Sequence, residues 1–392
     1  MSTTQLAVDT LRFATAGSVD DGKSTLVGRL LHDSKSILSD QLEAVTQASR
    51  GETPDLALLT DGLRAEREQG ITIDVAYRYF ATPRRRFILA DTPGHVQYTR
   101  NMVTGASTAD LAIVLVDARH GVVEQTLRHA AVTALLRVPH VVLAVNKMDL
   151  VDYDRAVFDR IVADFAVPSA TAIPLSALAG DNVVERSTRM DWYEGPTLLD
   201  HLETVQVAAE PASAPSRLPV QYVIRHGELR LYAGQLTSGT LSVGEAVTVL
   251  PSGRITTVTA IDRLGTPVER AAAGESVAVS LADELDISRG DLIAPTGQAP
   301  APTQDVVATV CHLHDRPLST GDRVLIKHTT RTVKAVVRDV PGGELAANGI
   351  GRITVRTAEP LALDPYAASR RTGSFLLIDP ADGATLTAGM AL

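Results

Sequence analysis

Apolar runs of strand length alternate with amphipathic stretches of helix length over the first half of the chain. The runs are LRFATAG, FILADTPGH, LAIVLVDA, HVVLAVNKMD and TAIPLSAL, and helix-length segments such as 123–137 and 153–165 separate them. Strands that are apolar throughout are typical of a parallel sheet covered by helices on both faces. We therefore predict an α/β domain over residues 1–207.

The pattern changes after this domain. The run AAEPASAPSRLP is rich in Ala, Pro and Ser, and it predicts a linker, which we place at 208–217. Short β-rich runs with glycine turns follow, as in YAGQLTSGTLSVGEAVTVLPSGRITTVTAI, and they favour a small barrel over 218–298. A second break, APTGQAPAPTQ, precedes another β-rich segment. We assign that segment to a second barrel over 302–392.

Composition narrows the class of protein. The chain has 392 residues, 45% of them hydrophobic, which is typical of a globular protein with more than one domain. Its net charge of -9 argues against a protein that mainly binds nucleic acid. The single cysteine, Cys311, excludes a disulfide framework, and we give it no role. The N-terminus has no basic region before an apolar run, and the longest apolar runs are far shorter than the about 20 residues of a membrane span, so we expect a cytoplasmic protein.

The stretch GSVDDGKS, residues 17–24, fits the phosphate-binding pattern G-x-x-x-x-G-K-[ST]. Its glycines let backbone N–H groups face phosphate oxygens, Lys23 reaches the β- and γ-phosphates, and the Ser24 hydroxyl ligates Mg²⁺. The alternative is a plain glycine-rich turn, but an apolar strand precedes the loop and a helix follows it, so we favour the nucleotide interpretation. The predicted phosphate-binding residues are Gly17, Ser18, Val19, Asp20, Asp21, Gly22, Lys23, Ser24, Thr25, Asp91, Thr92, Pro93 and Gly94.

Two further motifs extend the phosphate end of the predicted site. In DTPGH, residues 91–95, Asp91 is placed to hold Mg²⁺ through water, and the Gly94 amide is placed to sense the γ-phosphate. GITI, residues 70–73, supplies Thr72 as a second hydroxyl for the metal. The predicted Mg²⁺ site is therefore Ser24, Thr72 and, through water, Asp91.

Two motifs at later strand ends indicate guanine. Asp149 of NKMD accepts two hydrogen bonds from the guanine N1–H and exocyclic amine, which adenine does not offer. Asn146 either bonds the base edge or ties loops together, the Lys147 stem packs along the ring, and the Ala177 amide of SAL meets guanine O6. The predicted guanine-binding residues are Asn146, Lys147, Met148, Asp149, Ser176, Ala177 and Leu178. Because ligands bind at the carboxyl ends of parallel strands, the motifs together predict GTP or GDP with Mg²⁺.

His95 follows the glycine that would sense the γ-phosphate, where such NTPases place a residue that positions water. A lone histidine is more often structural, but we favour orientation of the hydrolytic water and predict His95 as catalytic. Arg64 and Arg67 precede Thr72. We interpret these two arginines as solvated rather than as an arginine finger.

A domain with GHV after DTP, followed by two small barrels, resembles the translation-factor superfamily of GTPases over essentially the whole chain. The fold class implied is a P-loop GTPase domain followed by two all-β barrel domains, as in elongation factors. By this resemblance, Val19 and Ile71 match the two apolar positions that flank the catalytic histidine, which implies a hydrophobic gate.

Long stretches resemble one branch of that superfamily, the GTPase subunit (subunit 1) of bacterial sulfate adenylyltransferase, or ATP sulfurylase. They are VDDGKSTLVGRLLHDSKSILSDQLEAV, DGLRAEREQGITIDVAYRYF, DTPGHVQYTRNMVTGASTADLAIVLVDARHGVVEQT, WYEGPTLLDHLE and LADELDISRGDLI. Elongation factors typically carry histidine where this chain has Asp21, and an acidic-aromatic pair where it has Gln97 and Tyr98. For Trp192 and Tyr193, simple packing is the alternative to a functional role.

The resemblance implies a nucleotidyltransferase of sulfate assimilation. A small adenylyltransferase subunit, joined to this chain as a heterodimer or higher assembly, would convert ATP and sulfate to adenosine 5'-phosphosulfate and pyrophosphate. GTP hydrolysis on this chain would drive that uphill step, through ordering and disordering of the segments around Thr72 and Gly94. No nucleic acid or membrane partner is expected. The alternatives are a translation-factor-type GTPase that acts with RNA or the ribosome, and a regulatory GTPase without an enzymatic partner.

Two departures from the family pattern stand out. The family's first barrel usually carries an extended RPN-type loop after its opening strand. In this chain the corresponding segment, VIRHGELRLYAGQ, is shorter near residues 225–231. Some relatives also carry a C-terminal kinase for adenosine 5'-phosphosulfate. This sequence has no second phosphate-loop pattern, so we expect that activity to be absent.

Overall fold

The computed structural model describes residues 9–37, 43, 45–46, 56–59, 75–94, 99–167, 169–207, 213–226 and 229–392. Contacts between residues divide the chain into two compact units, Met1–Val207 and Ala208–Leu392.

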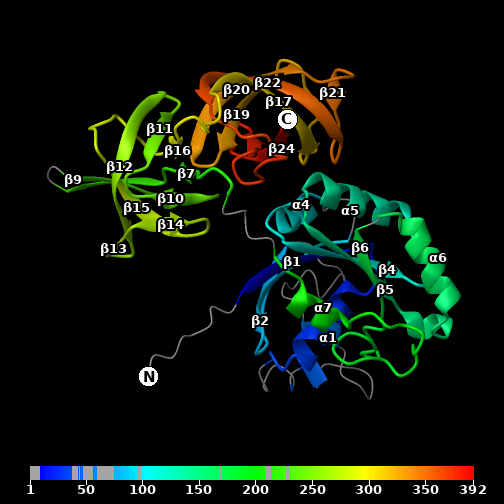
Figure 1. Ribbon diagram of the computed structural model, residues 1–392. Coiled ribbons are helices and arrows are strands. Elements are labelled where there is room, and N and C mark those ends of the chain that lie inside the picture. The colour runs from blue at the N-terminus through cyan, green and yellow to red at the C-terminus, as the bar shows by residue number, and fades with distance from the viewer. Residues whose placement is uncertain are drawn as a thin grey trace, which may run out of the picture. The chain divides into compact units, whose positions relative to one another are not determined.

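The first unit is built on a six-stranded sheet with α1 and α7 on one face and α4, α5 and α6 on the other (Figure 1). The strands are β1 (Thr10–Ala16), β2 (Ala76–Ala81), β3 (Arg86–Asp91), β4 (Leu111–Asp117), β5 (His140–Asn146) and β6 (Ala170–Pro174). The helices are α1 (Lys23–Asp33), α4 (Thr99–Ser107), α5 (Glu124–Leu135), α6 (Arg155–Phe165) and α7 (Leu198–Thr204), with short 3-10 turns η1 (Leu56–Leu59) and η3 (Met148–Val151). The strand order is β2-β3-β1-β4-β5-β6.

The apolar runs form strands of a sheet that is buried on both faces, as their pattern predicted. All seven residues of β4 are buried, because helices cover the sheet on both faces. The helices predicted within 123–137 and 153–165 are α5 and α6. Strands β3, β1, β4, β5 and β6 pair in parallel, so their carboxyl ends meet at one edge of the sheet.

The edge strand β2 departs from the predicted parallel sheet, because it runs antiparallel to β3. A tight turn joins the two strands, and in it the Thr82 amide donates to the Arg85 carbonyl at 2.9 Å. A turn this short leaves no room for the crossover that a parallel neighbour requires, so the pair is a hairpin.

The helix starts differ in a way that matters for the site. At the start of α6, the Asp154 carboxylate caps the helix by accepting a hydrogen bond from the Ala156 amide. Helix α1 follows Gly22, which adopts a left-handed conformation, and has no side-chain cap. The first-turn N–H groups of α1 are therefore left to other acceptors, such as phosphate oxygens.

The second unit is all β, with two separate hydrophobic cores. Its first part has the strands β7 (Leu218–Pro219), β8 (Tyr222–His226), β9 (Leu229–Gln235), β10 (Thr240–Ser242), β11 (Ala246–Leu250), β12 (Arg254–Arg263), β13 (Thr266–Val268), β14 (Arg270–Ala272), β15 (Ser276–Leu281) and β16 (Leu292–Pro295). Its second part has β17 (Thr303–His312), β18 (Leu318–Ser319), β19 (Arg323–His328), β20 (Arg331–Asp339), β21 (Glu344–Leu345), β22 (Ile350–Leu361), β23 (Ser374–Ile378) and β24 (Thr385–Ala391).

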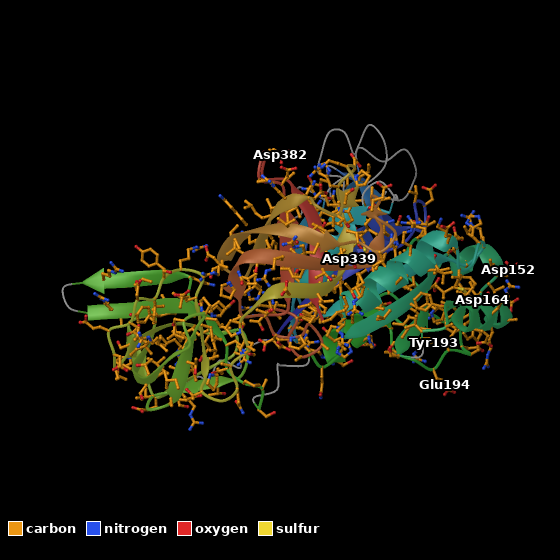
Figure 2. The ribbon with its side chains drawn as sticks, turned by 90° about the horizontal axis from the view of Figure 1, so that it is seen from above. Asp152, Asp164, Tyr193, Glu194, Asp339 and Asp382 are labelled. Atoms are coloured by element: carbon orange, nitrogen blue, oxygen red, sulfur yellow. The ribbon has the colours of Figure 1, made fainter. Side chains whose placement is uncertain are left out.

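Hydrogen bonds close β17-β22-β20-β19-β23-β24 into a barrel. Of the earlier strands, eight form one sheet, and β10 and β14 pair as a separate two-stranded sheet. Exposed carboxylates such as Asp339, at the end of β20, and Asp382, in the turn before β24, lie on the barrel surface (Figure 2). Arg217 joins the two parts through a two-pronged bond to Asp364, at 2.9 and 3.0 Å. In the described part of the chain, no helix is both long enough and apolar enough to cross a membrane.

Candidate functional site

The loop between β1 and α1 closes around the amino group of Lys23. Its Nζ donates to the carbonyl oxygens of Gly17 at 3.0 Å and Ser18 at 2.7 Å. Burial lowers the pKa of Lys23 below its usual value, although the Asp21 and Asp91 carboxylates oppose this shift. The loop therefore holds a buried cation at its centre, which is the charge that a phosphate group requires.

Backbone conformation explains the glycine at position 22. Gly22 has φ +92°, and a Cβ there would overlap the Asn146 side chain. Asp20, in the middle of the loop, has φ +67°. Asp21 closes the turn, because its carboxylate accepts from the Ser18 amide at 2.5 Å. Burial raises the pKa of Asp21, against the opposing charge of Lys23.

The predicted DTPG turn lies against this loop. Asp91 ends β3 and accepts from the Thr15 hydroxyl at 2.8 Å, and the Thr92 hydroxyl donates to the Thr15 carbonyl at 2.5 Å. A methyl group on Gly94 would collide with Lys23 Nζ and with the Gly17 carbonyl. Thr15 was missed by the sequence analysis, because only the pairing of β1 with β3 brings it to Asp91.

Asn146 ties three loops together, the second of the two interpretations that its motif allowed. Its amide nitrogen donates to the Asp21 carbonyl at 2.8 Å, and its oxygen accepts from the Ala177 amide at 2.9 Å. The Ala177 amide, which we expect to meet guanine O6, is thus bonded to Asn146 in this structure. Arg29 of α1 steadies the SAL loop by donating to the carbonyls of Ala177 and Leu178.

Asp149 presents an acceptor that nothing in the described part of the chain uses. Its Oδ1 atom is buried and has no hydrogen-bond partner among the described residues. The neighbouring Met148 is fully buried and belongs to the core, whereas Leu178 is 69% exposed. Ser176 is buried and braces its own turn, because its hydroxyl accepts from the Ala179 amide at 3.1 Å.

Lys147 has a partner that the sequence analysis did not find. Its Nζ lies 2.9 Å from Asp117 Oδ2 and donates to the carbonyl of Asp20. Asp117 ends β4, is 2% exposed, and also accepts from Arg119 through two side-chain bonds and one backbone bond. Burial alone would raise the pKa of Asp117, but the bonds from Arg119 and Lys147 hold it well below its usual range.

Two side chains of α5 also reach the site. Gln125 Nε2 lies 3.5 Å from the Gly94 carbonyl and 2.8 Å from His129 Nε2. His129 is 1% exposed, and its Nδ1 has no partner among the described residues. Burial, followed by the charges of Lys23 and Arg128, lowers the pKa of His129 to about 4. His129 is therefore a neutral side chain at pH 7.

Several predicted residues fall outside the described part of the chain. These are His95, Ile71 and Thr72, together with Arg64, Arg67, Gln97 and Tyr98. Val19, predicted as the other half of the gate, is 36% exposed on the phosphate loop.

Trp192 and Tyr193 pack inside the first unit. Both rings contact Phe158 of α6, and Trp192 Nε1 donates to the Tyr153 carbonyl. Burial raises the pKa of Tyr193 to about 12. These contacts support the packing interpretation of the pair. Tyr193 lies on the irregular segment before α7 (Figure 2).

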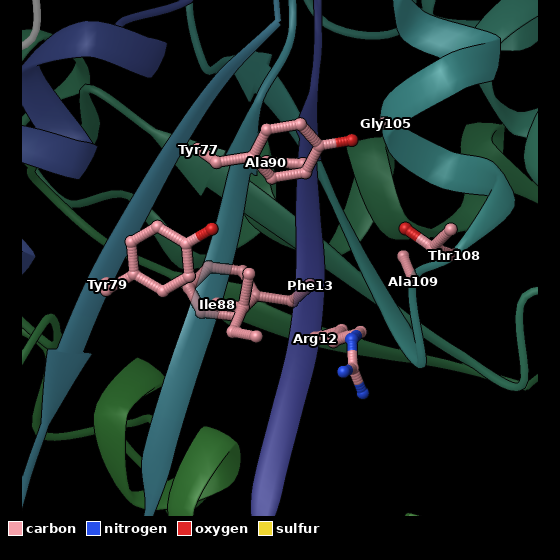
Figure 3. Close-up of a pocket in the computed structure, with 9 residues that line it drawn as sticks. All are labelled: Arg12, Phe13, Tyr77, Tyr79, Ile88, Ala90, Gly105, Thr108 and Ala109. Atoms are coloured by element: carbon pink, nitrogen blue, oxygen red, sulfur yellow. The ribbon is translucent and has the colours of Figure 1, made fainter. Parts of the chain in front are cut away.

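A cavity of about 270 Å³ lies elsewhere on the first unit, between strands β1, β2 and β3 and helix α4 (Figure 3). Tyr77 and Tyr79 of β2, Ile88 of β3 and Thr108 after α4 are among the residues that line it. None of the predicted nucleotide-binding residues does so. The candidate site is therefore the edge where the four loops meet, not this cavity.

Comparison with known families gives matches in both units of the chain. The family described as the elongation factor Tu GTP binding domain matches residues 9–215. The family described as the GTP-eEF1A C-terminal domain-like matches residues 305–392. Together the two matches fit an elongation-factor-like architecture, as the sequence predicted.

Curated relatives share about half of their residues with this chain. A bifunctional enzyme CysN/CysC of Mycobacterium tuberculosis (strain CDC 1551 / Oshkosh) is 54% identical, over 97% of this chain and 67% of the relative. A sulfate adenylyltransferase subunit 1 of Aeromonas salmonicida is 50% identical, over 97% of this chain and 86% of the relative. A protein of the same name from Vibrio vulnificus is 49% identical, over 97% of this chain and 85% of the relative.

Proposed function

Because this chain belongs to the sulfate adenylyltransferase subunit 1 family of elongation-factor-Tu-type GTPases, we propose that it is the GTP-hydrolysing, energy-coupling subunit of a sulfate adenylyltransferase in sulfate assimilation. The small catalytic subunit converts ATP and sulfate to adenosine 5'-phosphosulfate and pyrophosphate. This chain hydrolyses GTP to GDP and phosphate, and that reaction drives the first. One observation carries the GTPase assignment, namely that the phosphate loop, the DTPG turn and the NKMD and SAL loops meet at one edge of the sheet.

The phosphate end fits a nucleoside triphosphate. Lys23 gives up its bonds to the Gly17 and Ser18 carbonyls in favour of phosphate oxygens, which carry a full negative charge and therefore make stronger bonds. The uncapped start of α1 supplies N–H donors next to it. The amides of residues 17–25 complete the cradle.

The residues present also fit Mg²⁺. Ser24, at the start of α1, and Thr72 would hold the ion directly, and Asp91 would hold it through water. The carboxylate of Asp91 is fixed in place by the Thr15 hydroxyl, so it faces the loop without rearrangement. When bound, Mg²⁺ neutralises the charge that develops on the phosphate oxygens.

The base end fits guanine. The unpartnered Oδ1 of Asp149 is a buried acceptor, which is unfavourable until a donor meets it, and the N1–H and exocyclic amine of guanine supply two donors. Lys147 and the exposed Leu178 would cover the two faces of the ring. Asn146 positions this loop against the phosphate loop.

We assign GTP hydrolysis, and the switch between the GTP and GDP states, to the DTPG turn and the adjoining His95. His95 would orient the attacking water, with Val19 and Ile71 as an apolar gate beside it. The Gly94 amide would bond the γ-phosphate, and this bond disappears when phosphate leaves. The small subunit must bind the GTP and GDP states with different affinity for the energy to be transferred.

The name subunit 1 of the relatives implies a partner subunit. We propose the small adenylyltransferase subunit, in a heterodimer or a higher assembly, with no nucleic acid and no membrane, in the cytoplasm. We also propose the domain limits 1–207, 218–298 and 302–392, with a linker at 208–217. The names of the relatives do not favour a translation-factor role.

The test is formation of adenosine 5'-phosphosulfate from ATP and sulfate by this protein co-expressed with the small subunit of its own organism. The protein with the small subunit is compared with the small subunit alone, with and without GTP. Product and GDP should rise together only when both chains and GTP are present. GTP hydrolysis that never changes sulfate activation would reject the coupling role while leaving the GTPase assignment intact.

A further inference from the structure

Asp117 is a buried carboxylate to which the proposed chemistry gives no task. It lies at the end of β4 and is 2% exposed. Two cations hold it: Lys147 at 2.9 Å, and Arg119 through bonds of 3.1 and 2.6 Å. His120 lies 3.7 Å from the same carboxylate, on the exposed side. A buried acid with this many donors is fully ionised, so its charge is a fixed feature of the site.

The same small region holds a second carboxylate that must stay available. Asp149 Oδ1 is buried without a hydrogen-bond partner among the described residues. Both Arg119 and Arg189 lie close enough to Asp149 to interact with its charge. Lys147 is two residues away along the chain.

Each of these cations is engaged elsewhere. Lys147 and Arg119 bind Asp117. Arg189 donates to the Tyr153 hydroxyl at 2.5 Å, and that hydroxyl donates to Asp181. A carboxylate bound by lysine or arginine loses acceptor positions, so an Asp149 captured in this way could not offer both of its oxygens to the two guanine donors.

We propose that Asp117 is a specificity-determining, positioning residue, which holds Lys147 and Arg119 away from Asp149 and so keeps Asp149 free to read guanine. Through Lys147, which also bonds the Asp20 carbonyl, Asp117 fixes the base-reading loop against the phosphate loop. The inference rests on the proposed function, because it assumes that Asp149 reads the base.

The test compares GDP with IDP, whose base lacks the exocyclic amine and therefore keeps only one of the two bonds to Asp149. The wild-type protein should bind GDP about tenfold more tightly than IDP, which is the value of one bond to a charged acceptor. The Asp117→Asn substitution keeps the size of the side chain. In this variant, GDP affinity should fall, and the ratio of GDP affinity to IDP affinity (the GDP-to-IDP ratio) should approach about two. Asp117→Ser should behave in the same way, and it provides a second variant if the Asp117→Asn protein does not fold.

A double variant separates this role from a structural one. If the released Arg119 captures Asp149, then Asp117→Asn with Arg119→Gln should recover part of the GDP-to-IDP ratio, although it removes one more bond. Arg119→Gln alone leaves Lys147 on Asp117 and should keep the wild-type ratio. A GDP-to-IDP ratio unchanged in Asp117→Asn, or no recovery in the double variant, would overturn the inference.

Two further variants keep the inference and the proposed function apart. Asp364→Asn changes another buried, arginine-bound carboxylate, in the second unit, and should leave the GDP-to-IDP ratio unchanged. Asp149→Asn should shift preference from guanine to xanthine nucleotides, because it places a donor where an acceptor was. If the Asp149→Asn variant shows no such shift, the proposal that NKMD reads the base is wrong. If the shift occurs but Asp117→Asn still discriminates fully between GDP and IDP, only the proposed role of Asp117 is wrong.

Discussion

Gly94 lies so close to Lys23 that a methyl group on its Cα would collide with the lysine amino group. The turn after β3 and the phosphate loop after β1 are therefore packed without space for a side chain between them. This contact links the residue that would sense the γ-phosphate to the residue that would bind it.

Gly94→Ala should therefore weaken GTP binding more than GDP binding. The added methyl pushes the turn away from the loop, so the Gly94 amide loses the γ-phosphate while the β-phosphate contacts remain. We expect a roughly tenfold fall in the ratio of GTP to GDP affinity, the value of about one hydrogen bond to a charged group, by titration calorimetry. Gly351→Ala is the matched control, because there a Cβ meets only the Leu345 side chain. Equal losses for GTP and GDP would contradict the assignment.

Lys23→Ala should abolish tight binding of GTP and GDP. The buried ammonium supplies the main positive charge to the phosphates, and no other lysine or arginine among the described residues bonds the Gly17 or Ser18 carbonyl. The nucleotide-free variant should also unfold at a lower temperature than the wild type, because the buried Asp21 and Asp91 carboxylates lose the cation that opposes their charge. Thermal unfolding with and without GDP measures both effects. Unchanged affinity would count against the phosphate loop.

His95→Ala should leave nucleotide affinity intact and slow GTP hydrolysis. A residue that positions water acts on the transition state, so its loss should lower the single-turnover rate by about 100-fold. The control is His314→Ala, which removes a half-buried histidine of the second unit. A rate equal to that of the wild type would remove His95 from the mechanism.

His129 should make the first unit less stable in mild acid. Its pKa is about 4 in the folded protein, against about 6.5 when unfolded, so below pH 6.5 the unfolded chain binds a proton that the folded chain does not. The free energy of unfolding should fall by about 2 kcal/mol between pH 6.5 and 5 from this residue. Urea denaturation at the two pH values, compared with His129→Gln, isolates the effect from other buried histidines. Equal pH dependence in both proteins would show that His129 does not carry it.

The family and the fold class were predictable from the sequence, and both are confirmed. Each phosphate or base motif is a short local pattern whose chemistry follows from its own residues, as in GSVDDGKS. The alternation of apolar runs with amphipathic stretches gave the α/β domain, because burial on both faces requires strands that are apolar throughout. The sheet edge β2 was not predicted as antiparallel, because a four-residue turn decided its direction.

The sequence by itself thus determined which loops are predicted to carry the chemistry, because glycines, prolines and charged residues at strand ends are local signals. Only the tertiary structure decided which side chains hold those loops in place. Thr15 meets Asp91, and Asp117 meets Lys147, across 76 and 30 positions of the chain, because strand pairing brings their strand ends to one edge. No spacing in the sequence encodes such a meeting. The physical reason is that a carboxylate acquires its role from the charges that folding places around it, and those charges come from distant segments.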